Sequence, residues 1–140
     1  MKKIKILCST LLIGLASSLV NAEISVIVNI NNPNATLDQT TVSKIFLGKT
    51  KRFPDGSQAI PIDQDDGTSV RKSFNSSALG KSSSQLKSYW SRLIFTGKGT
   101  PPKQSGDDSA VKQLVANNPN IIGYIDSSAV DSSVKVVHKF

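Results

Sequence analysis

The sequence predicts an α/β fold in which a mixed sheet is flanked by helices. Short runs rich in β-branched residues alternate with amphipathic helical patterns, and Gly, Pro and Asn mark the connections between them. Helix-capping residues stand at the starts of several helical patterns. Strands that alternate with helices form mainly parallel or mixed sheets covered by those helices. The expected strands are residues 23–29, 58–63, 121–125 and 134–138.

Residues 1–22 have the layout of a secretory signal peptide. A basic start is followed by a mostly apolar run at 6–20, and Val-Asn-Ala at 20–22 offers small or β-branched residues to a signal peptidase. A transmembrane anchor is the alternative, but it needs about 20 apolar residues and this run has roughly 15. We therefore expect a periplasmic location and a mature domain at residues 23–140 that does not span the membrane.

Cysteine usage and charge narrow the function classes. Cys8, the only cysteine, lies inside the predicted leader, so the mature domain depends on a packed core rather than on disulfides. The chain has a net charge of +7, and removal of the three leader lysines leaves 14 basic against 10 acidic residues, or +4. The basic residues are scattered, which argues against nucleic acid as a partner and is compatible with small anions.

One strand and one helix are expected in the first part of the mature chain. The strand at 23–29 ends at an Asn-Asn-Pro turn. Thr36 and Gln39 fit a capping box at the start of the helix, and Gly48 ends it. The apolar face of this helix would consist of Val42, Ile45 and Phe46.

The second strand and the second helix follow a polar turn region. Pro61, within the strand 58–63, indicates a strand end or an edge position. Residues 67–69 (Gly-Thr-Ser) open the helix, and Gly80 closes it. The apolar positions of this helix are Val70, Phe74 and Ala78.

The third helical pattern is the strongest amphipathic stripe in the chain. Ser82 and Gln85 form a capping box at its start, and a loop rich in Gly and Pro at 97–106 follows it. Asp107 and Asp108 suit the positive start of a fourth helix. The stripe consists of Leu86, Tyr89, Trp90, Leu93 and Ile94.

A series of motifs resembles phosphate-type solute-binding proteins in the same order along the chain. Residues 45–49 (Ile-Phe-Leu-Gly-Lys) resemble a helix end of that family, and residues 66–69 (Asp-Gly-Thr-Ser) with Phe74 resemble a helix start that follows it. Trp90 and residues 122–124 (Ile-Gly-Tyr) continue the match. The resemblance covers nearly all of the mature chain, so the sequence is similar to phosphate ABC transporter substrate-binding proteins.

The resemblance implies a type II periplasmic binding protein fold, in which two α/β lobes close over an anion. This sequence resembles a single lobe, with residues 24–28 and 121–125 as the crossover strands and without a counterpart of the first lobe. The implied function is non-catalytic binding of phosphate or a similar small anion in connection with ABC transport, without a cofactor.

The anion motif of the family is an arginine, a short spacer and Ser-Gly-Thr at a helix start. Gly67 and Thr68 match this motif. Gln64 occupies the place of the arginine, and Ser69-Val70 replaces the Gly-Thr that should follow. The anion contacts that the resemblance implies are Gly67, Thr68, Ser69 and Arg71.

The helix start at residues 67–69 also has a physical rationale as an anion site. Free N–H groups point outward at a helix start, and the helix dipole favours negative charge there. The alternative is that Thr68 or Ser69 serves only as an N-cap. Asp65 and Asp66 oppose anion binding unless their carboxylates point away.

Other chemistry finds little support in the sequence. Asp63, Asp65 and Asp66 suggest a divalent metal, but no Glu follows where a Ca²⁺ loop needs one. His138 is the only histidine, which excludes a three-histidine metal site and leaves this one residue as the only base for a His-based triad. No Gly-x-Ser-x-Gly elbow is present. We therefore expect no enzyme activity, no metal and no cofactor.

A protein-interaction module of the envelope is the alternative function. The missing arginine and the missing lobe favour a loss of solute capture, with an envelope protein or an ABC transporter permease as the partner. Tyr89 and Trp90 could form a contact patch, although their place in the helical stripe predicts core packing. Arg52 and Phe53, in a loop predicted to be exposed, are a further contact candidate.

Overall fold

The computed structural model describes residues 23–140. The predicted signal peptide at residues 1–22 lies outside the described residues, so the leader and the domain boundary after it stay predictions. Within the described part of the chain, no helix is long and apolar enough to cross a membrane.

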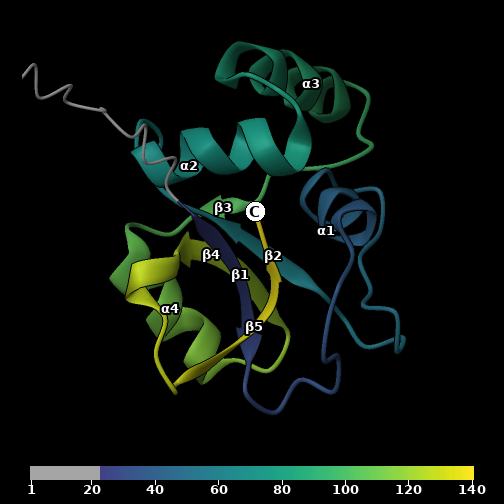
Figure 1. Ribbon diagram of the computed structural model, residues 1–140. Coiled ribbons are helices and arrows are strands. Elements are labelled where there is room, and N and C mark those ends of the chain that lie inside the picture. The colour runs from purple at the N-terminus through teal and green to yellow at the C-terminus, as the bar shows by residue number, and fades with distance from the viewer. Residues whose placement is uncertain (1–22) are drawn as a thin grey trace, which may run out of the picture.

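Five strands form one mixed sheet: β1 (Ile24–Asn29), β2 (Ile60–Asp63), β3 (Lys103–Gln104), β4 (Ile121–Asp126) and β5 (Val134–Lys139). Their order across the sheet is β3-β2-β4-β1-β5 (Figure 1). β2 is parallel to both β3 and β4, whereas β1 is antiparallel to both β4 and β5. The predicted α/β class with a mixed sheet is therefore confirmed.

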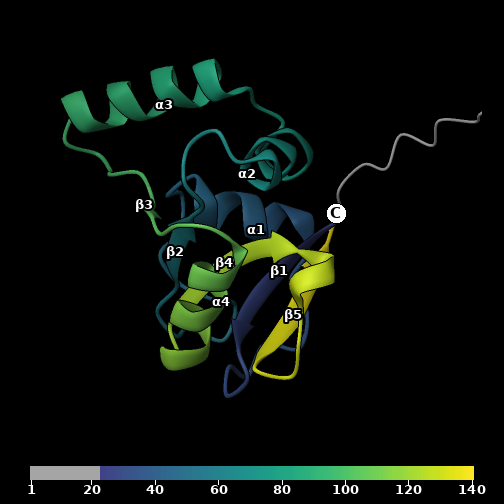
Figure 2. The same ribbon diagram turned by 90° about the vertical axis from the view of Figure 1, so that its left-hand side faces the viewer.

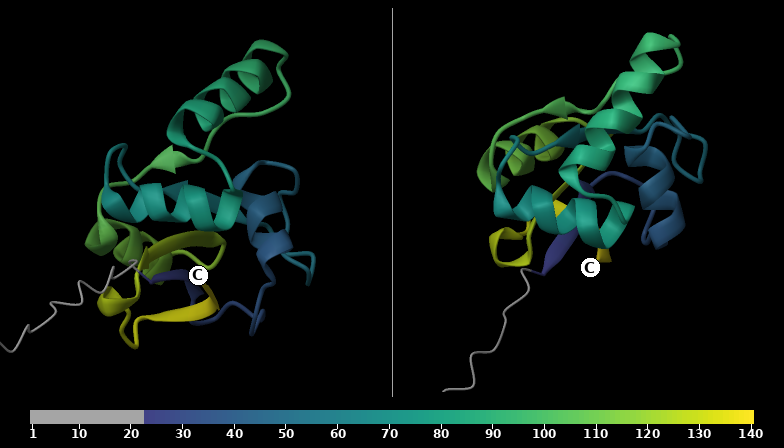
Figure 3. Two further views of the ribbon diagram at one scale, coloured as in Figure 1. Left: turned by 45° about the horizontal axis from the view of Figure 1, so that its top comes forward. Right: turned by 90° about the horizontal axis from the view of Figure 1, so that it is seen from above.

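The helices are α1 (Gln39–Phe46), α2 (Ser69–Phe74), α3 (Ser83–Phe95) and α4 (Asp108–Asn117). α2 continues without a break into a π-helical segment, η1 (Asn75–Leu79), and a 3₁₀ turn, η2 (Ser127–Ala129), follows β4. α1 and α2 pack on one side of the sheet and α4 packs on the other (Figures 1 and 2). α3 stands away from the sheet, above α2 (Figures 2 and 3).

The core has two halves, one on each face of the sheet. Along β1, Val26 belongs to the cluster beneath α1 and α2, whereas the next residue, Ile27, belongs to the cluster beneath α4. This alternation follows from the two-residue period of a strand, and the whole of β1 is buried because both faces are covered. At Gly123 of β4, an added Cβ would lie 2.6 Å from a methyl carbon of Val111, so glycine lets α4 approach the sheet closely.

Helix caps decide where the first helix begins. Asp38 is the N-cap of α1, and its side chain accepts a hydrogen bond at 2.7 Å from the backbone N of Thr41. The predicted capping box at Thr36 is wrong, because the carboxylate two residues later performs the capping role. The predicted capping box at Ser82 and Gln85 is present in full.

Two predicted loops differ from expectation. The loop at 97–106 contains β3, which pairs with Ile62 and Asp63 of β2 and leaves Pro61 beside an open edge. Phe53 is 2% exposed and belongs to the core, so the prediction that it lies on the surface is wrong.

α3 is weakly attached to the rest of the fold. Leu86 is its buried residue, and the ring of half-buried Trp90 lies against Gly48. Ile94 and Phe95, at the far end of the helix, are 54% and 92% exposed. The prediction that the apolar stripe packs in the core therefore holds for Leu86 and in part for Trp90, but not for Ile94.

Candidate functional site

The predicted anion-binding residues lie in the link between β2 and α2. The chain turns sharply here, and the backbone N of Thr68 donates to the carbonyl of Asp65 at 3.3 Å. Gly67 occupies the third position of this turn with a φ of +87°, which glycine adopts without strain. The local sequence Asp-Asp-Gly-Thr therefore builds the start of α2.

Thr68 is the N-cap of α2. Its side-chain oxygen accepts a hydrogen bond from the backbone N of Arg71 at 3.2 Å, while its hydroxyl proton remains available to a ligand. Gly67 and Ser69 are exposed, and their backbone N–H groups have no hydrogen-bond partner among residues 23–140. The start of α2 thus offers two free backbone donors and one capping hydroxyl.

Arg71 joins α2 to the end of β2. Its Nη2 lies 3.4 Å from Oδ2 of Asp63, and its Nη1 donates to the carbonyl of Gln64 at 3.1 Å. The same Nη1 lies 3.9 Å from Oδ1 of Asp66. The side chain is 18% exposed, and its Nε is buried without a partner among the described residues. Arg71 is therefore an anchor of the fold, and Asp63 compensates its charge.

Asp63 ends β2 and meets Tyr124 of the neighbouring strand β4. The Tyr124 hydroxyl donates to the Asp63 carboxylate and accepts a hydrogen bond from the backbone N of Gln64 at 3.2 Å. Burial raises the pKa of Asp63 above its ordinary value, although Tyr124 and Arg71 act in the opposite direction. Burial and the adjacent carboxylate raise the pKa of Tyr124, so the phenol stays protonated.

Gln64 ties three elements together behind this pair. It is 1% exposed, and its Nε2 donates to Oδ1 of Asp108 at 2.6 Å and to the carbonyl of Tyr124 at 3.1 Å. The same oxygen of Asp108 accepts from the backbone N of Asp126 at 3.1 Å. Gln64 therefore lies inside the protein and links β2, β4 and α4.

Aromatic packing holds Tyr124 in place. Its ring stacks on Phe74 with a centroid distance of 3.8 Å and an interplanar angle of 5°, and Phe46 packs edge-on against both rings. The three rings come from α1, α2 and β4. This packing fixes the position of the Tyr124 hydroxyl, which donates its hydrogen bond to Asp63.

Tyr124 and Asp108 carry roles at the site that the sequence patterns did not indicate. One signal was available: the carboxyl ends of parallel strands meet at one edge of a sheet, so polar residues near the ends of β2 and β4 could be expected to meet. The alternative of a metal bound by Asp63, Asp65 and Asp66 finds no support in the part of the chain described, where no group of three or more His, Cys, Asp or Glu could hold a metal ion.

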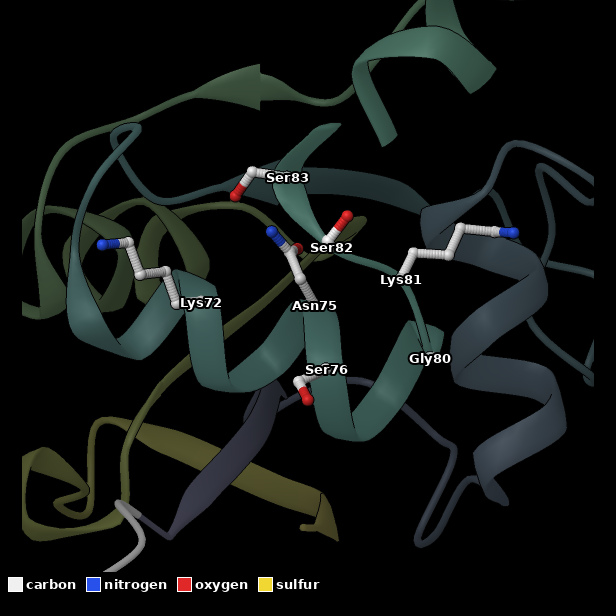
Figure 4. A pocket seen from close by; sticks show the side chains of 7 residues that line it. All are labelled: Lys72, Asn75, Ser76, Gly80, Lys81, Ser82 and Ser83. Carbon is white, nitrogen blue, oxygen red and sulfur yellow. The ribbon is translucent and has the colours of Figure 1, made fainter. Parts of the chain in front are cut away.

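Two surface hollows flank the helical segment formed by α2 and η1. One, of about 390 Å³, lies beneath α3 and includes Asp66, Arg71, Leu86, Trp90 and Ile94. The other, of about 460 Å³, lies between this helical segment and the start of α3 (Figure 4). We call this second one the basic hollow, and its residues include Lys72, Asn75, Ser76, Lys81, Ser82 and Ser83.

Comparison with known proteins places the fold. No protein-family model and no curated protein matches the chain. A phosphate ABC transporter substrate-binding protein from Clostridium perfringens, solved with bound phosphate, matches 84% of the chain with 26% identity and a TM-score of 0.66. An ABC-type phosphate transport receptor from Vibrio cholerae matches 84% with 21% identity and a TM-score of 0.65. PstS from Borrelia burgdorferi matches 83% with 11% identity and a TM-score of 0.61.

The match covers only part of each neighbour. The chain spans 45% of the Clostridium perfringens structure and 47% of each of the other two. The described domain therefore has the α/β fold of about half of a phosphate ABC transporter substrate-binding protein, as expected for a single lobe.

Proposed function

We propose that the domain is a non-catalytic binding module for phosphate or a similar small anion, which it holds at the start of α2. Gly67, Thr68 and Ser69 supply hydrogen-bond donors, and Arg71 supplies positive charge. The observation that carries the proposal is the pair of free amides at Gly67 and Ser69, in a fold whose Clostridium perfringens neighbour was solved with phosphate. A periplasmic location and a link to ABC transport belong to the same proposal.

The geometry supports weak binding to a partly hydrated ligand. The two amides, the hydroxyls of Thr68 and Ser69, and the helix dipole all favour an oxyanion. The described lobe by itself offers one wall, so water stays in contact with a ligand bound to it and each hydrogen bond contributes little. We expect a dissociation constant on the order of a millimolar.

The nearby carboxylates limit the affinity. Asp65 accepts a hydrogen bond from the backbone N of Gly106 at 3.0 Å, which holds its carboxylate toward the 97–106 loop. Asp66, with a side chain 74% exposed, can move away and leave Arg71 to the anion. Asp63 stays paired with Arg71, so the guanidinium can contribute only part of its charge.

A binding role fits this site better than catalysis does. The pKa of Tyr124 is raised and Asp63 is held by Tyr124 and Arg71, so neither group is a free general base. Two of the structural neighbours are named as a substrate-binding protein and a transport receptor.

Titration calorimetry with inorganic phosphate tests the proposal. Saturable heat is expected for the purified protein and should disappear in the Thr68→Ala, Ser69→Ala double variant. Ser109→Ala, which removes an exposed hydroxyl from the first turn of α4, is the matched control and should bind like the parent. Ser69→Ala alone keeps the N-cap and guards against a folding defect. Equal heats in all variants, or none at millimolar phosphate, would contradict an anion site here.

A protein-interaction module is the second candidate, and the far end of α3 favours it. Ile94 and Phe95 are exposed there, and exposed apolar side chains on a projecting helix are typical of contact surfaces. From residue 67 to residue 106 the chain has seven basic residues and no acidic one, which suits an acidic envelope partner.

Site-specific photocrosslinking distinguishes this candidate. A crosslinking amino acid at Phe95 should give one defined adduct in cells if α3 is a contact surface. The same group at Ile30, which is 56% exposed in the link between β1 and α1, is the control and should give none. The absence of an adduct at both positions would reject an interaction through α3.

A further inference from the structure

The basic hollow carries a second inference, which goes beyond the site at the start of α2 (Figure 4). We propose that it binds the phosphate group of a small anion, either free phosphate or a phosphate monoester. Three features of the hollow favour this ligand: a side-chain amide without a protein partner, two lysines outside any ion pair of the described residues, and the start of a 13-residue helix.

Asn75 is the observation that points to a ligand. Asn75 is 3% exposed, and its side-chain amide makes no hydrogen bond to any of residues 23–140. The amide still touches solvent at the hollow, since Nε of Arg71 is the one fully buried side-chain polar atom without a partner in this part of the chain. Figure 4 shows this side chain directed toward Ser82 and Ser83 at the start of α3. An amide with so little access to water gains free energy from a hydrogen-bond partner. An oxygen of a ligand in the hollow would supply that partner. Asn75 also begins the π-helical segment, an irregularity that is frequent at functional sites.

The charge of the basic hollow favours an anion. Lys72 and Lys81 lie on either side of Asn75, with their ammonium ends directed outward (Figure 4), and neither belongs to an ion pair among the described residues. The Nζ of Lys81 lies 5.8 Å from the ring centroid of Tyr89, a contact that leaves its charge uncompensated. No acidic residue lines the hollow. The start of α2, by contrast, has three aspartates within or beside it.

The start of α3 adds further donors. This helix has 13 residues, and the Ser82 hydroxyl accepts from the backbone N of Gln85 at 3.2 Å. The backbone N–H groups of Ser83 and Ser84 have no partner among residues 23–140. They lie at the positive end of the helix dipole, where a negative group is favoured.

A tetrahedral oxyanion matches this combination. It has acceptors on every side, so it can accept from the Asn75 amide, from the Ser83 backbone and from serine hydroxyls at once. Lys72 and Lys81 have long, flexible side chains, and when these turn toward the hollow their two ammonium groups balance the charge of a phosphate dianion. A neutral ligand would leave both lysines unused.

Nuclear magnetic resonance titration of the ¹⁵N-labelled protein at low salt tests this site. Inorganic phosphate and glycerol phosphate are the two probes. Signals of the Asn75 side-chain amide and of the Ser83 backbone are expected to shift in a saturable way. The probe with the lower dissociation constant shows whether the hollow prefers free phosphate or a phosphate monoester.

Charge-removing variants give the matched comparison. Lys72→Gln with Lys81→Gln should weaken binding at Ser83 about 10-fold, since both counter-charges are lost. Lys44→Gln with Lys49→Gln removes the same charge beside another hollow, near α1, and should change the affinity by less than about 2-fold. Asn75→Asp keeps the side-chain size but replaces the donor with a carboxylate, and should abolish the response.

The outcomes separate this inference from the proposed function. An unchanged affinity in the Lys72, Lys81 variant, or an equal loss in the Lys44, Lys49 control, overturns the basic hollow as a site. If phosphate shifts Ser83 and not Gly67, the basic hollow stands and the site at the start of α2 fails. If phosphate shifts Gly67 and not Ser83, the reverse holds.

Discussion

Tyr124 connects β4 to the end of β2 through a single hydroxyl. The group donates to Asp63 and accepts from the backbone of Gln64, so its removal leaves buried polar atoms without a partner. Tyr124→Phe should lower the free energy of unfolding by about 1–3 kcal/mol, measured by urea denaturation. Tyr89→Phe removes a hydroxyl that donates to the carbonyl of Leu47 at 2.6 Å in a half-buried position, and should cost less. A loss in Tyr89→Phe as large as that in Tyr124→Phe would contradict this role.

Asp63 makes the stability of the fold depend on pH. Burial is the largest influence on this carboxyl and raises its pKa in the folded protein. As the pH rises through about 4, the unfolded chain ionises first, so the unfolded state releases more protons and Asp63 lowers the stability. The stability of the parent relative to Asp63→Asn should therefore fall as the pH rises above about 4. A relative gain over that range would show that the ion pair with Arg71 outweighs burial.

The sequence could indicate the start of α2 but not the state of Arg71. Gly67 and Thr68 form a recognisable turn and cap because their conformational preferences are local. Whether Arg71 faces a ligand or Asp63 depends on how α2 packs against β2, and local patterns do not contain that information. The burial of Gln64, which is 1% exposed, also depends on tertiary packing and could not be predicted from its polar side chain.

At the scale of elements, α3 is the helix with the least support from the fold. Its capping box stabilises the first turn, but Leu86 is the one buried residue of this helix. Its amides should therefore exchange with solvent through local opening rather than through global unfolding.

Two cap variants test this difference. Ser82→Ala should speed hydrogen exchange in α3 and shift the fluorescence of Trp90, the only tryptophan, with little change in global stability. Asp107→Ala removes the N-cap of α4, which packs on the sheet, and should lower global stability by about 1 kcal/mol. A global loss in Ser82→Ala equal to that in Asp107→Ala would show that α3 is an integral part of the core.

Most helices and strands were predictable from the sequence. The exceptions, β3 and the exposed part of α3, depend on tertiary packing, which local residue patterns do not describe. The four main strands and the helix ends at Gly48 and Gly80 follow from local residue preferences. β3 is a short strand in a loop and exists because β2 offers a free edge. The stripe on α3 has the period of a core helix, but periodicity cannot show how much surface is available to cover it.

At the scale of the whole molecule, the fold corresponds to about half of its structural neighbours. The chain spans 45% of the Clostridium perfringens structure, and its sheet, helices and short β3 form one continuous domain. In the described domain taken by itself, the start of α2 and the basic hollow are open to solvent. Binding at either place should therefore be weak and sensitive to salt.

The most direct test of the central claim is a map of the backbone amides that respond to phosphate. A titration followed by ¹H–¹⁵N correlation spectra should show saturable shifts at Gly67 and Ser69, with a midpoint on the order of a millimolar. Sulfate and chloride at equal ionic strength separate specific binding from screening. If neither amide responds to phosphate more than to chloride, the start of α2 does not bind the anion and the account is wrong.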